Sequence, residues 1–318
     1  MSDKHVLVTG ASGLLGRQVV RAFGDDGWTV TGTAFSRANG TTLRKVDLED
    51  ASAVEAVLES VTPSVVVHCA ANRFPDKVDK DPQGTKRLNI DASKSLASLC
   101  AARNIVLIYI STDYVFPGTK GEAPYEADTT PSPPNLYGES KLDGEKAVLG
   151  VYSESKDTTG RAVVLRVPVL YGQAEKPSES AVNTLLDTVN KVQAPDASAK
   201  MDHWSIRYPT NTEDVARVLK DVAKKYRSAD PSTTLPPVLQ FSSEDRYTKY
   251  EICQLLAEVL GVGLDRLEAD PTGGNVPGGV QRPYDCHLST KALQDLGIPV
   301  HTQNFKDWWR RELKAFRH

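Results

Sequence analysis

The sequence predicts an α/β protein built on a doubly wound parallel sheet. Two observations support this fold class. Apolar runs alternate with amphipathic stretches from the first residues onward, in the order strand, helix, strand. Runs such as Val65–Val67 and Val106–Ile110 are apolar on both faces, as strands are when helices cover both sides of a parallel sheet. Units of this order join parallel strands by right-handed crossovers.

Helical periodicity is clearest over Leu14–Phe23, where Leu15, Val19 and Phe23 recur at i, i+4 spacing. The strands expected are His5–Thr9, Thr29–Thr33, Leu43–Val46, Val65–Val67, Val106–Ile110 and Ala162–Val167. The other helices expected are Ala51–Ser60, Lys86–Ala102, Leu136–Gly150, Glu179–Val192, Thr212–Lys224, Thr248–Leu260 and Phe305–Phe316.

The second half of the chain is less regular than the first. Loops rich in proline and glycine, at Pro231–Pro237 and Pro271–Gly279, separate its expected helices. We therefore expect residues 1–172 to form mainly the sheet domain. Residues 173–318 should form mainly a smaller lobe near the carboxyl edge of the sheet, with some segments returning to the sheet.

Composition narrows the class of partner. Of the 318 residues, 40% are hydrophobic and 25% are charged, and the net charge of −3 favours neither nucleic acid nor an acidic membrane surface. No apolar run approaches the roughly 20 residues that span a bilayer. The N-terminus has no signal-peptide pattern, and the four cysteines have no metal-type spacing. A cytoplasmic protein with reduced thiols and no metal is expected.

A glycine-rich turn follows the first strand and opens the first helix. Its spacing, G-x-x-G-x-x-G over Gly10–Gly16, permits a tight turn and close approach of the backbone to a pyrophosphate. The helix N-terminus then faces the phosphates. The sequence thus predicts a dinucleotide site of the Rossmann type. The residues expected to contact the cofactor here are Gly10, Ser12, Gly13, Leu14, Leu15 and Gly16.

The end of the second strand indicates which cofactor is bound. NAD-binding proteins place a carboxylate there for the ribose 2′-hydroxyl, whereas this chain reads Phe35-Ser36-Arg37. The Arg37 guanidinium can pair with a 2′-phosphate, and Ser36 can donate a hydrogen bond to it. Arg37 as a solvated surface side chain is the alternative. The sequence favours NADP(H).

The glycine spacing resembles that of the short-chain dehydrogenase/reductase superfamily. This resemblance implies further cofactor contacts after the third strand, after the fourth strand and at the end of the strand Ala162–Val167. The residues concerned are Asp47 and Leu48 at the adenine edge, Cys69, Ala70 and Ala71 in a small-residue turn, and Val167.

Tyr137 and Lys141 lie one helical turn apart on one face of a predicted helix. A nearby ammonium lowers the pKa of a tyrosine, so that the phenol can exchange a proton with a carbonyl. Tyr152 and Lys156 share the spacing and are interpreted as solvated side chains. Only Tyr137 follows a strand end, Ser111–Tyr114, in the order used by the superfamily. The resemblance assigns Thr112, Tyr137 and Lys141 to hydride transfer at a carbonyl, with Lys141 also holding the nicotinamide ribose.

Two longer segments indicate a narrower family. Ile108–Gly118 and Asn135–Lys146 resemble dTDP-4-dehydrorhamnose reductases, and equally the regulatory β subunits of methionine adenosyltransferase. Both belong to the extended short-chain dehydrogenase/reductases. The first group implies NADPH-dependent reduction of a nucleotide-linked 4-keto sugar. The second implies an NADP-binding partner of the catalytic subunit that forms S-adenosylmethionine.

Other segments resemble the β subunits more than the reductases. They are Arg73–Asp76, Leu88–Ser93, Glu179–Val182, Met201–Trp204, Arg207–Thr210, Asp214–Ala216 and Gln281–Pro283. Two features depart from the known patterns. Asp285-Cys286-His287 stands where sugar reductases tend to carry Asn-Ser. The chain stops at His318, close to its last helix, whereas the β subunits can continue in a docking tail, so the resemblance leaves the docking mode and the complex open.

Aromatic and cationic residues predict a pocket wall facing the nicotinamide. The substrate-pocket residues expected are Asp113, Val115, Phe116, His203, Trp204, Arg207 and Arg282. For His203, Trp204 and Arg207 the alternative is loop packing. Trp308 and Trp309, beside two arginines, could form a partner surface or pack in the core.

Three functions are consistent with these residues. The first is a regulatory, NADP(H)-binding partner of the methionine adenosyltransferase catalytic subunit, which modulates S-adenosylmethionine synthesis. The second is an NADPH-dependent reductase of a nucleotide-linked 4-keto-6-deoxy sugar. The third is a redox-sensing scaffold. The triad does not discriminate between the first two, because the regulatory relatives retain it.

Overall fold

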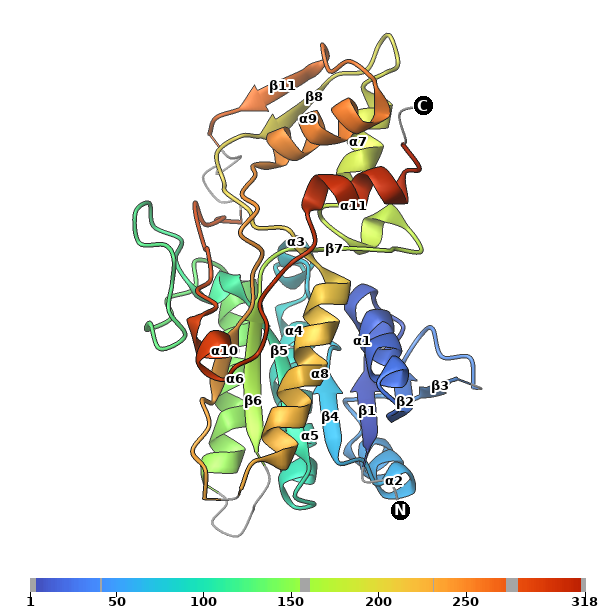
Figure 1. Cartoon of the computed structure of the whole chain (residues 1–318), viewed down its shortest axis with the longest axis vertical. Coiled ribbons are helices and arrows are strands. Elements are labelled where there is room, and N and C mark those ends of the chain that lie inside the picture. Colours follow the sequence, from blue (N-terminus) through green and yellow to red (C-terminus); the bar gives the residue numbers. More distant parts are fainter. Residues whose placement is uncertain (1–3, 41, 155–160, 231, 273–279, 316–318) are drawn as a thin grey trace.

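The computed structural model describes residues 4–40, 42–154, 161–230, 232–272 and 280–315. Its centre is a parallel sheet of seven strands (Figure 1). The strand order is β10 (Val238–Gln240), β6 (Ala162–Val167), β5 (Val106–Thr112), β4 (Val65–His68), β1 (His5–Thr9), β2 (Thr29–Ala34) and β3 (Leu43–Lys45). The chain order reverses at β1, so the predicted doubly wound fold is confirmed.

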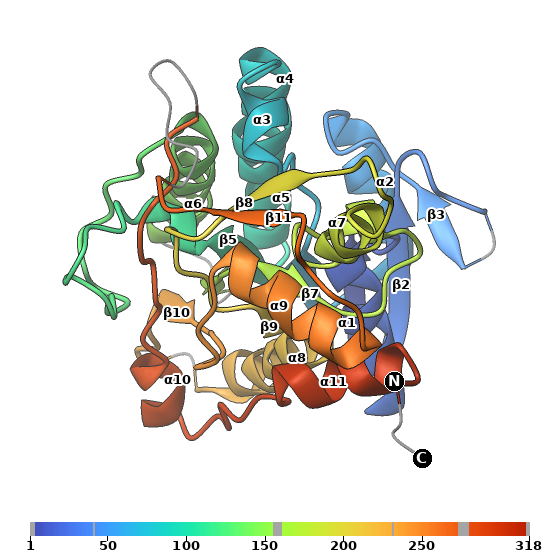
Figure 2. The same cartoon turned by 90° about the horizontal axis from the view of Figure 1, so that it is seen from above.

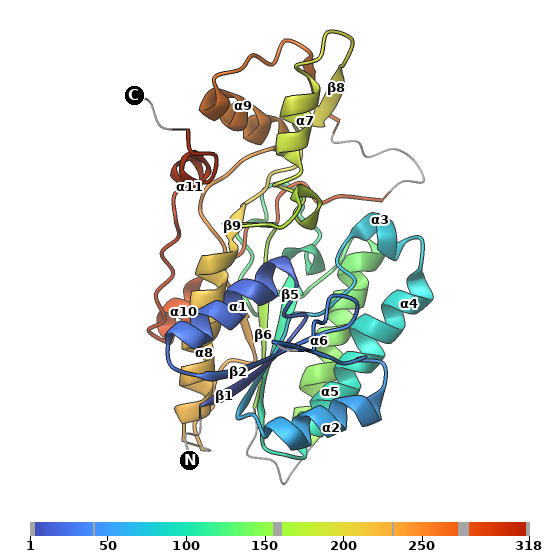
Figure 3. The same cartoon turned by 90° about the vertical axis from the view of Figure 1, so that its right-hand side faces the viewer.

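Helices cover both faces of the sheet (Figure 3). One face carries α1 (Leu14–Asp25) and α8 (Thr212–Ser228), and the other carries α2 (Ala51–Val61), α5 (Ala92–Ala101) and α6 (Leu136–Glu154). Alternation along the strands explains this arrangement. In β4, Val65 and Val67 pack in the core beneath α1 and α8, whereas Val66 packs in the core on the opposite face. The continuous apolar runs therefore mark strands buried on both sides.

A smaller lobe lies above the carboxyl edge of the sheet (Figure 2). It contains α7 (Leu185–Lys191), α9 (Lys249–Leu260), α11 (Phe305–Glu312) and a two-stranded pair, β8 (Ala199–Asp202) with β11 (Leu267–Asp270). A second pair, β7 (Leu170–Tyr171) with β9 (Thr210–Asn211), lies where the chain passes between the lobe and the sheet domain. Helix α9 begins with a capping box formed by Thr248 and Glu251. The short helix α10 (Lys291–Asp295) lies beside β10.

Two predicted helices differ from the structure. The stretch expected over Lys86–Ala102 begins earlier, at α4 (Pro82–Lys86), and passes through a π-helical turn, Arg87–Asp91, before α5. The helix expected over Glu179–Val192 is wrong in its first half. Only Leu185–Lys191 is α-helical there, because Ser180 Oγ accepts hydrogen bonds from the N–H groups of Val182 and Asn183 and holds a local turn.

Several elements were not predicted at all. They are β7, β8, β9, β10, β11, α10 and the short helix α3 (Pro75–Val78). Four predictions lie partly outside the described residues: the loops Pro231–Pro237 and Pro271–Gly279, the Tyr152–Lys156 pair, and the helix Phe305–Phe316, of which Phe305–Glu312 is helical. Tyr152 itself is not a fully solvated side chain, because its hydroxyl donates to the Ile105 carbonyl at 2.9 Å.

Candidate functional site

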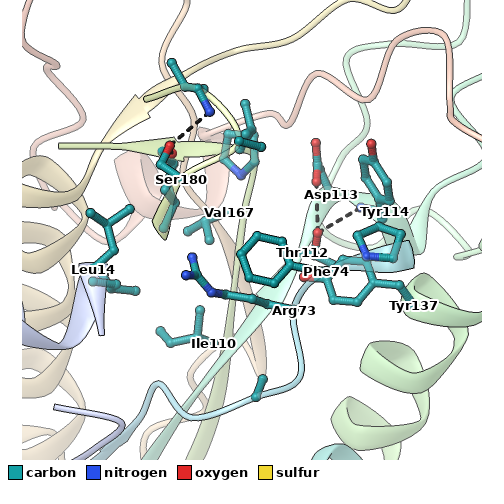
Figure 4. A pocket seen from close by; sticks show the side chains of 18 of the residues that line it. Leu14, Arg73, Phe74, Ile110, Thr112, Asp113, Tyr114, Tyr137, Val167 and Ser180 are labelled. Atoms are coloured by element: carbon teal, nitrogen blue, oxygen red, sulfur yellow. Dashed lines mark hydrogen bonds between the residues drawn. The ribbon is translucent and has the colours of Figure 1, made fainter. Parts of the chain in front are cut away.

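A cavity of about 300 Å³ lies at the carboxyl ends of β1, β4, β5 and β6, beneath the lobe. This is where doubly wound sheets bind their ligands. Figure 4 shows Leu14 and Ser180 on one side of the cavity and Thr112 and Tyr137 on the other, with Arg73 extending between them. The cavity thus joins the glycine-rich turn to the candidate catalytic residues.

The glycine-rich turn has the geometry that a bound pyrophosphate requires. Gly10 has φ of +63°, a left-handed conformation that favours glycine. A Cβ on Gly16 would lie 2.2 Å from the Gly10 carbonyl oxygen, so only glycine allows α1 to start this close to β1. Gly10, Gly13, Leu14, Leu15 and Gly16 all line the cavity, whereas Ser12 does not. These residues fit a dinucleotide whose phosphates face the N-terminus of α1.

Arg37 lies just after β2, where the adenosine ribose of a dinucleotide is expected. It is neither wholly solvated nor unpaired, because its Nη1 donates to Glu179 Oε1 at 2.5 Å and to Glu175 Oε2 at 3.2 Å. Ser36 and Phe35 beside it are exposed. The ammonium of Lys45 lies 5.8 Å from the centre of the Phe35 ring. The predicted adenosine end of the site is therefore exposed to solvent, and its arginine is paired with two acids, Glu175 and Glu179.

The remaining predicted cofactor residues fall into two groups. Cys69, Ala71 and Val167 line the cavity, as the strand ends place them. Ala70, Asp47 and Leu48 do not line it. Asp47 is exposed and accepts a hydrogen bond from the Glu49 N–H at 3.0 Å.

The candidate catalytic residues meet at the end of β5. The Thr112 hydroxyl donates to Asp113 Oδ1 at 2.9 Å, and Tyr137 lies against the Tyr114 ring with centroids 5.9 Å apart. Burial raises the pKa of Asp113 to about 6, although the hydrogen bond from Thr112 partly offsets it. Thr112, Asp113, Tyr137 and Lys141 all line the cavity. The predicted triad is thus brought together in one wall.

One electrostatic expectation was wrong. Burial raises the pKa of Tyr137, although a hydrogen bond with Thr112 partly offsets it. Lys141 is not among the groups that shift the Tyr137 pKa, and its ammonium donates to the Tyr109 hydroxyl at 2.8 Å. Burial also lowers the pKa of Lys141 to about 7, although the Glu145 carboxylate partly offsets it. The Lys141 ammonium is therefore held by Tyr109 of the central strand β5.

The polar residues behind Lys141 were not predicted from the sequence. Tyr109 interrupts an otherwise apolar strand, and its hydroxyl lies 3.4 Å from the Asn89 carbonyl, to which it donates. The Asn89 side chain donates to Ser140 Oγ at 3.1 Å and to the Asn72 carbonyl at 3.0 Å. Asn89 lies in the π-helical turn, which periodicity did not predict. The one sequence signal for these polar contacts was Tyr109, the single tyrosine in the predicted strand Val106–Ile110.

Two glycines and a buried ion pair hold α6 against the sheet. A Cβ on Gly138 would lie 2.1 Å from the Tyr114 carbonyl oxygen, and one on Gly144 would lie 2.2 Å from the Tyr109 hydroxyl. Glu145 accepts from Arg166 of β6 through both carboxylate oxygens, at 2.9 and 2.7 Å. Glu145 follows Lys141 by one turn of the helix. The helix that carries Tyr137 and Lys141 is thus fixed in position.

The wall contributed by the lobe is cationic. Arg207, Lys249 and Arg282 line the cavity, and Arg282 Nη2 lies 3.4 Å from Asp76 Oδ1 of α3. Burial lowers the pKa of Lys249 to about 8, and the charges of Arg207 and Arg282 lower it further. Arg207 is buried, and its Nη2 lies 3.8 Å from Asp202 Oδ2 without a hydrogen bond within the described residues. This wall can receive an anion.

Four predicted pocket residues do not line this cavity. Val115 and Phe116 are fully buried in a small apolar cluster, where Phe116 stacks on Tyr125. His203 pairs with the Thr248 hydroxyl at 2.9 Å, and Trp204 packs on Tyr284 with centroids 5.1 Å apart. Trp204 is therefore partly buried by loop packing, whereas His203 is exposed. Arg207, by contrast, reaches the cavity.

The tryptophan pair also packs in a core. Trp308 and Trp309 are 5% and 1% exposed and lie against Tyr171 and Phe305 in the lobe. Within the described parts of the chain, no group of histidine, cysteine or acidic side chains has an arrangement that could hold a metal ion. None of the described helices combines the length and the hydropathy needed to cross a bilayer.

The doubly wound sheet, the glycine-rich turn and the Tyr137–Lys141 pair define a protein of the extended short-chain dehydrogenase/reductase class. The sequence matches the family described as the RmlD substrate binding domain over residues 4–317. It is 43% identical over 300 residues to methionine adenosyltransferase 2 subunit beta of Pongo abelii, covering 94% of this chain and 84% of that protein. It is 39% identical over 318 residues to the same protein of Danio rerio, covering 99% and 92%. The chain therefore belongs to the RmlD substrate-binding-domain family, in the branch that includes methionine adenosyltransferase 2 subunit beta.

Solved structures agree on the fold. The dTDP-4-dehydrorhamnose reductase of Bacillus anthracis, in complex with NADP, superposes with a TM-score of 0.80 at 20% identity and covers 98% of this chain and 99% of that chain. The UDP-glucose 4-epimerase of Thermus thermophilus, in complex with NAD, gives 0.77 at 22% identity and covers 98% of each chain. The resemblances found in Ile108–Gly118 and Asn135–Lys146 are thus confirmed at the level of the family.

Proposed function

We propose that this chain is an NADP(H)-binding regulatory subunit of methionine adenosyltransferase that modulates S-adenosylmethionine synthesis. The observation that carries this proposal is the 43% identity over 300 residues to proteins named as the beta subunit of that enzyme. Identity of this extent spans both the sheet domain and the lobe. The proposed partner is the catalytic subunit.

The geometry of the cleft supports the cofactor part of the proposal. The glycine-rich turn, the small residues Cys69 and Ala71, and Val167 surround the space in which a dinucleotide would lie. Arg37 is the group proposed to pair with a 2′-phosphate, because no acid follows β2 directly. When bound, NADPH would supply a hydride. The chain itself would hold the cofactor and position Lys141 against the nicotinamide ribose.

A kinetic titration tests the regulatory role. The chain is added in increasing amounts to a methionine adenosyltransferase catalytic subunit, and the rate of S-adenosylmethionine formation is measured over a range of methionine concentrations. We expect the rate or the KM for methionine to change until the two proteins are equimolar, and then to stay constant. Kinetic constants that stay unchanged through a several-fold excess would contradict the proposal.

A second candidate is an NADPH-dependent reductase of a nucleotide-linked 4-keto-6-deoxy sugar. The cationic wall favours it, because Arg207, Lys249 and Arg282 could hold a diphosphate while the sugar faces Tyr137. Thr112 would position the carbonyl oxygen, and the Tyr137 hydroxyl would give it a proton. The signature is oxidation of NADPH with such a sugar that Tyr137→Phe abolishes. No oxidation above background with a keto sugar would eliminate this candidate.

A further inference from the structure

A loop from the lobe reaches across to the glycine-rich turn. We refer to residues 172–180, between β7 and α7, as the strap. Both its ends are fixed: the Asn183 side chain donates to the Gly172 carbonyl at 2.8 Å, and the Ser180 hydroxyl donates to the Leu170 carbonyl at 2.7 Å. Ser180 and the two residues after it line the cavity. The strap therefore lies at the border between the lobe and the proposed cofactor site.

Glu179 of the strap connects three parts of the site. Arg17 of α1 donates to its Oε2 at 2.6 Å and to its Oε1 at 3.3 Å, and Arg37 donates to the same Oε1 at 2.5 Å. Arg17 also donates to the Ser12 carbonyl of the glycine-rich turn at 2.7 Å. Glu175 adds a second acid, 3.2 Å from Arg37 and 3.5 Å from Arg17. Two guanidinium groups are thus matched by two carboxylates.

The charge on Glu179 persists at any ordinary pH. Burial alone would raise the pKa of this carboxyl, but hydrogen bonds from Arg17 and Arg37 outweigh burial and hold the pKa at about 2. The Glu179 side chain is only 11% exposed, whereas that of Glu175 is 59% exposed. Arg37 is therefore already neutralised by carboxylates before any ligand binds. A phosphate that approaches Arg37 meets a guanidinium already paired with acids.

We propose that Glu179, assisted by Glu175, sets the selectivity of the site between NADP(H) and NAD(H) by competing with the 2′-phosphate for Arg37. This inference rests on the proposed cofactor function. A 2′-phosphate takes Arg37 from the carboxylates, while Glu179 keeps its two bonds to Arg17. NAD has no such phosphate and leaves the ion pairs in place. The preference for NADP(H) is consequently smaller than an unpaired Arg37 would give.

Calorimetric titration of NADP⁺ and NAD⁺ into the full chain tests the competition. Glu179→Gln removes the competing charge, and because a part-exposed ion pair changes an equilibrium constant by up to about five-fold, NADP⁺ should bind about five-fold more tightly. NAD⁺ affinity should stay within about two-fold, since NAD⁺ does not displace the pair. Glu175→Gln should act in the same direction but less, because Glu175 is more exposed. Glu268→Gln, which removes an exposed acid on β11, is the matched control and should change neither affinity.

Three outcomes separate this inference from its alternatives. Equal loss of both affinities in Glu179→Gln would mean that Glu179 only holds the strap in place, and would overturn the proposal. In an Arg37→Ala background, Glu179→Gln should leave the NADP⁺ to NAD⁺ ratio unchanged; a ratio that still moves would show that Arg37 is not the contested group. Failure of the unmodified chain to bind either dinucleotide would instead overturn the proposed function itself.

Discussion

The buried ion pair between Glu145 and Arg166 yields a sharp prediction about stability. Both side chains are almost fully buried, at 3% and 4% exposure, and they meet in a two-pronged contact at 2.9 and 2.7 Å. Glu145→Gln keeps the shape of the side chain but leaves the Arg166 cation without a counter-charge. Removing one partner of such a pair costs about 3–5 kcal/mol in the free energy of unfolding.

The expected shift in melting temperature follows from the size of the chain. An unfolding entropy of about 2.1 cal/mol/K per residue gives about 0.7 kcal/mol/K for 318 residues, so a loss of about 4 kcal/mol lowers the midpoint by about 6 °C. Thermal unfolding followed by circular dichroism measures it. The double variant Glu145→Leu with Arg166→Met should recover most of the loss, because no unpaired charge remains. Glu268→Gln, whose pair with Lys200 is exposed, is the control. A shift below about 2 °C for Glu145→Gln would refute the reasoning.

Three further predictions concern the cofactor site and its charges. Arg37→Ala should weaken NADP⁺ binding at least about five-fold more than NAD⁺ binding in calorimetry, because only NADP⁺ carries the 2′-phosphate; equal loss would remove Arg37 from the assignment. The pKa of Lys141, about 7 in the fold against an ordinary 10.5, means that the unfolded chain binds the extra proton between these values. The free energy of unfolding should therefore rise with pH from about 7 to 10, by up to about 1.4 kcal/mol per pH unit, and Lys141→Met should reduce that slope in urea titrations. Lys249, with a pKa of about 8, should take up a proton when an anion enters the cavity at pH 8.5. Calorimetry of a nucleoside diphosphate in buffers of different ionisation enthalpy would detect that uptake, and Lys249→Met should abolish it.

The sheet and the glycine-rich turn could be predicted from sequence because their signals are local. Strands buried on both faces read as continuous apolar runs, and β1, β5 and β6 fell where such runs occur. The turn could be predicted because its close backbone contacts require glycine at Gly10 and Gly16. This requirement appears in the sequence as a characteristic glycine spacing. The same holds for Tyr137 and Lys141, whose spacing is that of one helical turn.

The lobe wall and the strap could not be predicted in the same way. The short strands β8 and β11 pair with each other although they lie more than sixty residues apart in sequence. Periodicity within one segment does not reveal such a pairing. The meeting of Arg37 with Glu179 joins residues 142 positions apart. Lys249 fell inside the predicted helix Thr248–Leu260 without any functional signal, and only the fold brings it to the cavity. Val115 and Phe116 failed as pocket residues because a 3₁₀ turn after β5 directs them into the core.

The direct test of the proposed function is whether the chain forms a defined complex with a methionine adenosyltransferase catalytic subunit. Size-exclusion chromatography with light scattering, on the two proteins separately and mixed at micromolar concentration, with and without NADP⁺, measures the mass of each species. We predict a mixed species whose mass exceeds that of the catalytic subunit's own assembly by one or more 34.6 kDa chains. Elution of the mixture as the sum of its separate components, with NADP⁺ saturating, would contradict the regulatory role and turn attention to keto-sugar substrates.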